Sequence, residues 1–223
     1  KFFKKILLRS SNLDYISLGI KALKANTPVN KIFDAINNYS DNSEIRYVGG
    51  CVRKIINKEK VDDIDLATNI TPKIVCEILR KNNISFYESG IEHGTITAKI
   101  NDYKFEITTL RKDVLTDGRF AKVEFSKDWY EDASRRDFTF NAIYADLNGN
   151  LYDPFNGKKD LELGKVNFIG DPEKRIKEDY LRILRYVRFF LNYSKVDHSE
   201  SLKKTIMQNL NGMSKISSDR QLD

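Results

Sequence analysis

The chain has 223 residues, of which 40% are hydrophobic and 31% are charged. This length allows one large domain or two small domains with real hydrophobic cores. No apolar run approaches the length of a membrane span, and the basic start at residues 1–8 has too short an apolar part for a signal peptide. We therefore expect a cytoplasmic protein without membrane contact.

Charge and the rare residue types narrow the function classes further. Lys plus Arg is 38 and Asp plus Glu is 32, a net charge of +6 that suits nucleic acid, although a solvated Lys-rich surface explains it equally well. Cys51 and Cys76 have no ligand-like spacing, which fits a reducing cytosol. With only His93 and His198, a histidine-rich metal site and a Ser-His-Asp hydrolase are disfavoured.

The first half of the chain predicts helices and strands in alternation. Thr71 and Pro72 have the residue types of an N-cap and a first helical position. In chain order we expect one or two helices at 14–39, with Pro28 opening the second, then a strand at 45–48, a helix at 51–57, a strand at 64–67 and a helix at 72–81.

The second half begins with strand patterns and ends with helix, and residues 148–150 (NGN) are a strong hairpin signal. The fold class is therefore α+β, with a mixed β-sheet domain at 1–155 and a helical domain at 156–223. We expect strands at 84–88, 94–100 and 103–110, a loop at 111–122, hairpin strands at 140–145 and 151–153, and helix from 171 to 193.

Residues 62–66 (DDIDL) are the strongest chemical signal. On a strand, Asp63 and Asp65 point to the same face while Ile64 points into the core. Carboxylates this close repel each other unless a cation lies between them, and hard oxygen ligands beside phosphate suit Mg²⁺. The preceding turn at Gly49 and Gly50 lets a triphosphate approach the backbone closely. Together they indicate metal-dependent nucleotidyl transfer.

Two further residues extend this first constellation. Glu106, on a predicted strand, would supply the third carboxylate of a two-metal site, although an outward-facing strand residue is an equally good interpretation. Arg53 follows the glycine turn by one helical turn and could meet a phosphate, or be an ordinary surface arginine. The turn lacks the Gly-Lys-Ser/Thr ending of a P-loop, which disfavours a Walker-type NTPase.

A second constellation lies in residues 134–142 (SRRDFTFNA). The arginine pair, Arg135 and Arg136, suits phosphate, while Asp137 and Asn141 suit ribose hydroxyls. The alternative interpretation is a salt-bridged corner of the fold.

The third constellation is the predicted helix at 178–188 (EDYLRILRYVR). Helical spacing places Asp179, Arg182 and Arg185 on one face, which in most proteins is simply an amphipathic helix with ion pairs. Cytosine and adenine, however, both present an amino donor beside a ring-nitrogen acceptor. A carboxylate next to a guanidinium therefore matches C and A, and a wrong base would leave charged groups unpaired.

In this order the three constellations resemble the class II tRNA nucleotidyltransferase and poly(A) polymerase family, within the DNA polymerase beta superfamily, and most of all the CCA-adding enzymes of alpha-proteobacteria. The likeness runs from about residue 45 to 190. The matching stretches are YVGGCVRK, DDIDLATNITP, EHGTITA, FEITTLRKDVLTDGR, RRDFTFNAIYADLNGNLYDPFNGKKDL and FIGDPEKRIKEDYLRILRYVRFF.

The resemblance implies a catalytic head, a helical neck at 156–223 and roles for individual residues. It also implies Mg²⁺ as cofactor, CTP and ATP as substrates and the tRNA 3′ acceptor end as partner, while the oligomeric state stays open. For the head, the implied roles are metal binding by Asp63 and Asp65 with Glu106 as third carboxylate, and triphosphate contact by Gly49, Gly50 and Arg53. Phosphate and ribose contact would come from Arg136 and Asp137, supported by Arg135 and Asn141.

The protein template for the base would be Asp179 and Arg182, with Arg185 and Arg188 nearby. A flexible loop from Arg111 to Phe125 would help the switch from C to A, and Arg111 itself would bind nucleotide.

This sequence also departs from the family. Lys54 stands where relatives usually have Asp, and Phe120 where they tend to have His. Because Asp223 falls within the expected neck, we expect the family's body and tail, which bind the tRNA acceptor arm, to be missing here and tRNA affinity to be weak.

The function expected from the sequence is addition of C and A nucleotides to the tRNA 3′ end with release of pyrophosphate. Alternatives are an enzyme that adds only CC or only A, a bacterial poly(A) polymerase, and a non-catalytic RNA-binding fragment.

Overall fold

The computed structural model describes residues 15–114 and 122–216. The chain divides into two compact units, each treated by itself below. Unit 1 comprises the described residues of Lys1–Ala133 and Ile143–Tyr152, and unit 2 those of Ser134–Ala142 and Asp153–Asp223. The predicted domains met at a single boundary between residues 155 and 156. In the structure, Ser134–Ala142 belongs to unit 2, although the residues before and after it in sequence belong to unit 1. The separate functions expected for the two parts stay a prediction.

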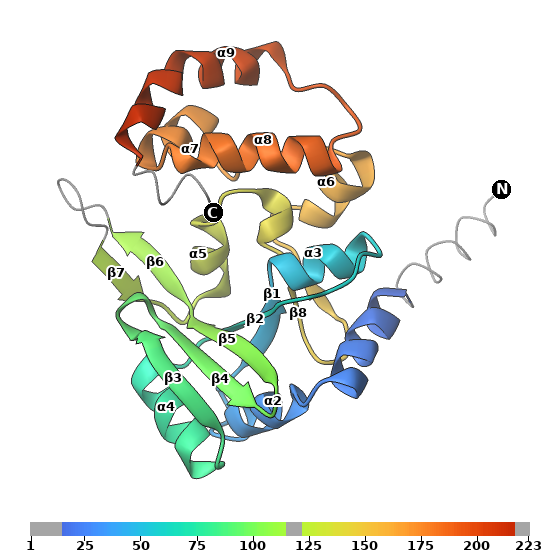
Figure 1. Cartoon of the computed structure of the whole chain (residues 1–223), viewed down its shortest axis with the longest axis vertical. Coiled ribbons are helices and arrows are strands. Elements are labelled where there is room, and N and C mark those ends of the chain that lie inside the picture. Colours follow the sequence, from blue (N-terminus) through green and yellow to red (C-terminus); the bar gives the residue numbers. More distant parts are fainter. Residues whose placement is uncertain (1–14, 115–121, 217–223) are drawn as a thin grey trace. The chain divides into compact units, whose positions relative to one another are not determined.

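A seven-stranded sheet in the order β3-β4-β5-β2-β1-β8-β9 is the framework of unit 1 (Figure 1). β2 and β5 pair in parallel, and the other neighbours in this sheet are antiparallel. The strands are β1 (Ile45–Val48), β2 (Ile64–Thr68), β3 (Ser85–Gly90), β4 (Thr95–Ile100), β5 (Tyr103–Thr109), β8 (Tyr144–Ala145) and β9 (Leu151–Tyr152).

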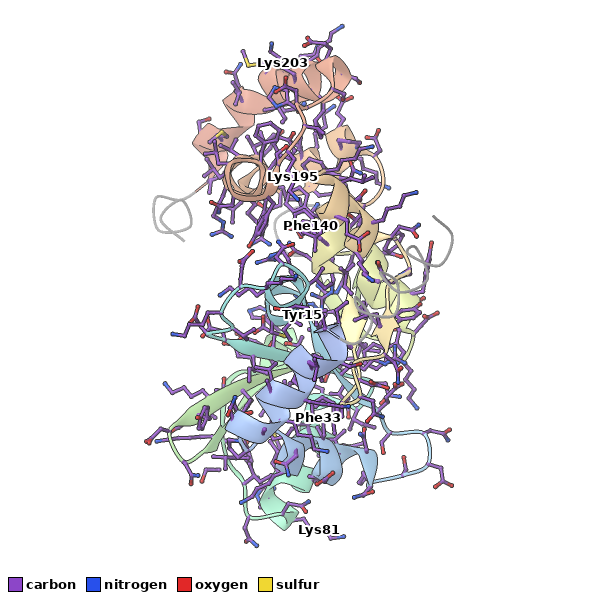
Figure 2. All side chains as sticks on the ribbon, turned by 90° about the vertical axis from the view of Figure 1, so that its right-hand side faces the viewer. Tyr15, Phe33, Lys81, Phe140, Lys195 and Lys203 are labelled. Atoms are coloured by element: carbon purple, nitrogen blue, oxygen red, sulfur yellow. The ribbon has the colours of Figure 1, made fainter. Side chains whose placement is uncertain are left out.

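Helices pack on this sheet through apolar stripes. In α4 (Pro72–Lys81), which packs on β3 and β4, the buried residues Val75, Ile78 and Leu79 recur at helical spacing. α2 (Asn30–Asn37) packs on β1, where the rings of Phe33 and Tyr47 lie 4.8 Å apart; Figure 2 labels Phe33. Unit 1 also contains a helix at 15–26, α3 (Gly50–Ile56), the 3-10 helix η1 (Ile91–His93) and most of α5 (Trp129–Ser134).

Unit 2 is helical around an aromatic core. Phe138 and Phe140 from the inserted segment pack with Phe168 and with Phe189, at ring-centroid distances of 4.7 to 5.4 Å for the pairs Phe138–Phe168, Phe138–Phe189 and Phe140–Phe189. All four rings are buried, which explains why Ser134–Ala142 belongs to this unit. Its helices are η2 (Thr139–Asn141), α6 (Gly157–Leu163), α7 (Pro172–Glu178), α8 (Leu181–Tyr193), α9 (Glu200–Asn209) and η3 (Leu210–Lys215).

The α+β class is confirmed, but three predicted segments differ in the structure, two of them strand or loop and one helical. The predicted loop at 111–122 is in part a two-stranded ribbon of β6 (Arg111–Val114) and β7 (Lys122–Phe125), joined across the strands by an ion pair between Lys112 and Glu124. The predicted strand at 140–145 is shortened to β8, because Thr139–Asn141 turns as η2. The middle of the predicted flexible loop, residues 115–121 with Phe120, lies outside the described residues, as does the start at 1–8.

The predicted continuous helix from 171 to 193 is interrupted. α7 ends at Glu178, and α8 begins at Leu181, because Asp179 has an extended backbone with φ −153° and ψ 107°. Its side-chain Oδ1 accepts a hydrogen bond from the backbone N–H of Leu181 at 3.1 Å, as a residue capping a helix start does.

None of the helices within 15–114 and 122–216 has both the length and the apolar character needed to cross a bilayer.

Candidate active site and nucleotide-selecting segment

Two predicted carboxylates lie side by side on the parallel pair of strands. Asp65 on β2 is in direct register with Glu106 on β5. Ile64 and Leu66, the neighbours of Asp65 along the strand, are buried, whereas Asp65 is half-buried and Glu106 is exposed. The alternation of faces along a strand therefore turns both carboxylates away from the core, and Asp63, also exposed, precedes β2 by one residue.

The turn at Gly49 and Gly50 and the side chain of Arg53, the predicted triphosphate contacts, lie next to Asp65 on β2. Gly49 has φ 67° and ψ −120°, a conformation that favours glycine, and its N–H donates to the carbonyl of Ile143 at 3.2 Å. A Cβ placed on Gly50 would lie 3.8 Å from Oδ2 of Asp65 and 3.9 Å from Nη2 of Arg53. The turn, a carboxylate and a guanidinium thus converge on one spot in unit 1.

Cys51 supports this arrangement, although the sequence analysis noted only that the cysteines lack ligand-like spacing. Its thiol is buried, with Sγ 3.3 Å from the carbonyl oxygen of Val48 and 3.6 Å from that of Asp65. Burial raises the pKa of Cys51 to about 11, so at neutral pH it is a thiol that joins α3 to the carboxylate strand. The only feature of the sequence that could have indicated this role is the position of Cys51 directly after Gly49 and Gly50.

The donor set suits a hard divalent cation, because Asp63, Asp65 and Glu106 offer only carboxylate oxygens. Across the described ranges, however, no three or more His, Cys, Asp or Glu side chains group closely enough to hold a metal ion. Asp65 and Glu106 therefore lie on one face of the sheet, with Asp63 just before β2, without forming a closed cage.

Asp62, the first aspartate of residues 62–66, forms ion pairs with two lysines. Its carboxylate lies 3.1 Å from Nζ of Lys54 and 3.4 Å from Nζ of Lys60, and the hydrogen bonds from these ammonium groups lower its pKa. Lys54, which departs from the family's usual aspartate, therefore has an acidic partner just before the carboxylate strand.

Arg111 opens β6 and is held at both its backbone and its side chain. Nη1 donates to the carbonyl of His93 at 2.5 Å, and the backbone N–H donates to Oδ1 of Asp132 at 3.2 Å. Asp132 is buried and also accepts a hydrogen bond from the hydroxyl of Tyr144 at 2.7 Å. The structure thus adds Asp132, which the sequence did not single out, as an anchor of this predicted nucleotide-binding residue.

In unit 2, Asp137 is the centre of a compact network. Oδ2 accepts from Nε and Nη2 of Arg185 at 2.7 and 2.6 Å, and Oδ1 accepts from Asn141 Nδ2 at 2.9 Å and from the backbone N–H of Phe138 at 2.8 Å. Burial alone would raise the pKa of Asp137, but the charge of Arg185 and these hydrogen bonds outweigh it and hold the pKa below its usual value. Four donors fill the acceptor sites of this carboxylate.

The two predicted phosphate-binding arginines precede Asp137 and are held through their backbone. The carbonyls of Arg135 and Arg136 both accept from Nη2 of Arg175, the second at 2.8 Å. The side chain of Arg136 reaches the carbonyl of Asn141 at 3.4 Å. Arg175 was not among the predicted site residues, because nothing in its local sequence indicates a partner 40 residues away.

Of the two predicted base-selecting residues, Arg182 pairs with Glu178 in the structure. Nη1 of Arg182 donates to Oε2 of Glu178 at 2.8 Å, while Asp179 caps α8. The break between α7 and α8 explains this, since the predicted common face required an unbroken helix. Arg188 lies further along α8, exposed, with its guanidinium carbon 5.3 Å from the ring centroid of Phe189.

The family described as "Poly A polymerase head domain" has a sequence model that matches residues 45–167, more than half of the chain. This chain belongs to that family. The predicted class II tRNA nucleotidyltransferase membership is thereby confirmed, and the family implies use of a divalent metal ion. The likeness to alpha-proteobacterial enzymes stays a prediction.

Individual relatives agree with this assignment. "CCA tRNA nucleotidyltransferase 1, mitochondrial" of Homo sapiens is 46% identical over 186 residues, which cover 81% of this chain and 42% of the relative. The "CCA-adding enzyme" of Lactobacillus helveticus is 38% identical over 179 residues, covering 79% and 44%. The crystal structure of the Bacillus stearothermophilus CCA-adding enzyme in complex with CTP matches with a TM-score of 0.75 and 30% identity, covering 87% of this chain and 46% of that one. The chain thus spans less than half of the length of each relative.

Proposed function

We propose that this chain is the catalytic part of a tRNA nucleotidyltransferase that adds C and A nucleotides to the tRNA 3′ end from CTP and ATP and releases pyrophosphate. The observation that carries the proposal is the convergence of Gly50, Arg53 and Asp65 on one spot, with Glu106 in register beside it, inside the matched family segment. A cytoplasmic location stays a prediction.

In this proposal Mg²⁺ is the divalent ion, held by Asp63 and Asp65 with Glu106 as the third carboxylate. When bound, it supplies charge neutralisation for the triphosphate and lowers the pKa of the attacking 3′-hydroxyl. The protein's own contribution is position. The N–H groups at the glycine turn and the guanidinium of Arg53 would orient the phosphates, and the β2–β5 pairing would fix Asp65 and Glu106 side by side on one face of the sheet.

Unit 2 would select the base in this proposal. Cytosine and adenine share an amino donor next to a ring-nitrogen acceptor, whereas uracil and guanine present a carbonyl next to an N–H. Asp179 and Arg182 would read this difference, and Arg182 is kept in one orientation by its hydrogen bonds to Glu178 and to the carbonyl of Arg175. A wrong base would leave half-buried charged groups unpaired.

The test incubates the chain with Mg²⁺, tRNA lacking its terminal CCA, and each labelled nucleoside triphosphate singly and together, with products resolved at single nucleotides. Stepwise C, C and A additions are expected. A ladder of many A residues would instead favour a poly(A) polymerase, the second candidate, which the description of the matched family head domain allows. No nucleotide addition would contradict both.

Asp65→Ala should lower the rate by about a thousandfold or more, because it removes a ligand that acts directly on the reacting groups. The control is Asp62→Ala, three residues earlier, whose carboxylate pairs with Lys54 and Lys60. Similar rates for wild type and Asp65→Ala would overturn the assignment of this carboxylate.

A further inference from the structure

Arg175, in the last turn of α7, joins three functional segments of unit 2. Its Nη2 donates to the carbonyls of Arg135 and Arg136, and its Nη1 lies 2.5 Å from Oε2 of Glu178. The same Oε2 accepts from Nη1 of Arg182 at 2.8 Å, and that nitrogen also donates to the backbone carbonyl of Arg175 at 2.6 Å. Arg175 therefore restrains Arg182 through both Glu178 and its own backbone.

These contacts are only partly exposed to solvent. The side chains of Arg175, Arg182 and Glu178 are 11%, 13% and 26% exposed, so water and salt screen their ion pairs less than they screen fully exposed pairs. Hydrogen bonds from a charged donor are about twice as strong as those between neutral groups. A planar guanidinium can serve two carbonyls and a carboxylate at once, which the single ammonium of lysine does less well.

α7 has stabilising contacts other than those of Arg175. Asp171 caps the helix by accepting from the backbone N–H of Lys174 at 2.8 Å, Pro172 occupies the first turn, and Ile176 is its buried anchor. The contacts of Arg175 are instead directed at the turn that carries Arg135 and Arg136 and at the base-selecting segment.

We propose that Arg175 is a positioning residue for nucleotide selection. It holds the turn at 135–137 and the guanidinium of Arg182 in one fixed arrangement, so that preference for C and A over U and G depends on it. This inference rests on the proposed function, because it assumes that Arg182 reads the base.

The first experiment measures hydrogen exchange and does not require turnover. In Arg175→Gln, backbone amides of Ser134–Ala142 should exchange about tenfold faster than in wild type, since two carbonyls of that segment lose their charged donor. The matched control is Lys177→Gln on the same helix, which removes an exposed ion pair with Glu173 and should leave this segment unchanged. Equal exchange in wild type and Arg175→Gln would overturn the proposal.

The second experiment measures selectivity as the ratio of kcat/KM for CTP and ATP to that for UTP and GTP. Arg175→Gln should lower this ratio by about tenfold to a hundredfold, since a small misplacement of a selecting group is costly. Arg175→Lys should restore little of it. A merely structural role would instead lower addition of all four nucleotides equally.

Glu178→Gln tests the proposal with a variant that keeps Arg175. It leaves the Arg175 bonds to the carbonyls in place, so exchange of Ser134–Ala142 should stay near wild type while the selectivity ratio falls. An unchanged ratio in this variant would contradict the proposal even if Arg175→Gln did not fold. A wild-type chain that adds no nucleotide would count against the proposed function, whereas the exchange result would still decide whether Arg175 holds the turn.

Discussion

The carboxylates of the two units differ in their exposure and in their ion pairs with arginine. In unit 1, Asp63 and Glu106 are exposed, and no lysine or arginine of the described residues forms an ion pair with either. In unit 2, Asp137 and Glu178 each accept hydrogen bonds from arginines, and Asp137 is buried. The first arrangement keeps acceptor oxygens available for a cation, whereas the second uses them to fix the position of guanidinium groups.

The largest effect should come from the open carboxylates. Glu106→Gln should lower the nucleotide-addition rate by about a hundredfold, because it removes a negative charge beside the reacting phosphates, and should leave unfolding unchanged, because no buried contact is lost. Single-turnover primer extension measures the rate, and Glu88→Gln, an exposed glutamate on β3, is the control. A Glu106→Gln variant that is active but clearly less stable would contradict the comparison.

The next effect should be on stability, from a paired carboxylate. Asp137→Asn should cost unit 2 about 2 kcal/mol, below the usual figure for breaking a buried pair, since the Arg185 side chain is 37% exposed. Urea denaturation followed by circular dichroism measures the loss. Glu173→Gln, at an exposed pair on α7, should cause no measurable change, and equal stability of the Asp137→Asn variant and wild type would show that Asp137 does not organise unit 2.

A pH titration sharpens the same comparison. Because the pKa of Asp137 is lowered in the folded chain, the unfolded state binds its proton more tightly. The resulting stability is fully present above the unfolded pKa of about 4 and is lost as the pH falls below it toward the folded pKa. Melting temperatures between pH 6 and pH 2.5 should show a steeper acid loss for wild type than for Asp137→Asn. Parallel curves would remove Asp137 as the cause.

The smallest effect is expected at Lys54. Its pairing with Asp62 is exposed, so Lys54→Ala should leave the melting temperature and the addition rate within experimental error. A rate loss of more than about tenfold would mean that this pair helps to place the neighbouring aspartates. The departure of Lys54 from the family would then be functional.

Local patterns of hydrophobic and capping residues predicted several helices and strands. Residues 45–48 form β1 as predicted, and the predicted helix at 72–81 is α4, although Thr71 at its N-cap position makes no side-chain capping bond. The break at Asp179 was missed because no Gly or Pro marks it, although an aspartate just before Leu181 is a capping signal. Polar residues at 111–125 concealed a ribbon, which forms because Arg111–Val114 pairs with Lys122–Phe125.

In the candidate site, too, local sequence patterns indicated the residues themselves but not their distant partners. Asp63 and Asp65 were found from a spacing of two residues, and Glu106 from its strand pattern. The partner of Asp137 lies 48 residues away in Arg185, and that of Arg136 lies 39 residues away in Arg175. Side-chain periodicity contains no information on contacts at such separations, which depend on how helices of unit 2 pack.

The interleaving of the two units along the chain has a consequence for dissecting the protein. The ribosome releases Ser134–Ala142 before β8 and β9, so the sheet of unit 1 is completed only after part of unit 2 has been synthesised. A truncation after Tyr152 would keep Phe138 and Phe140 but remove their partners Phe168 and Phe189. The two exposed aromatic rings would then favour aggregation. Soluble expression of unit 1 alone would therefore require replacing Ser134–Ala142 with a short polar linker.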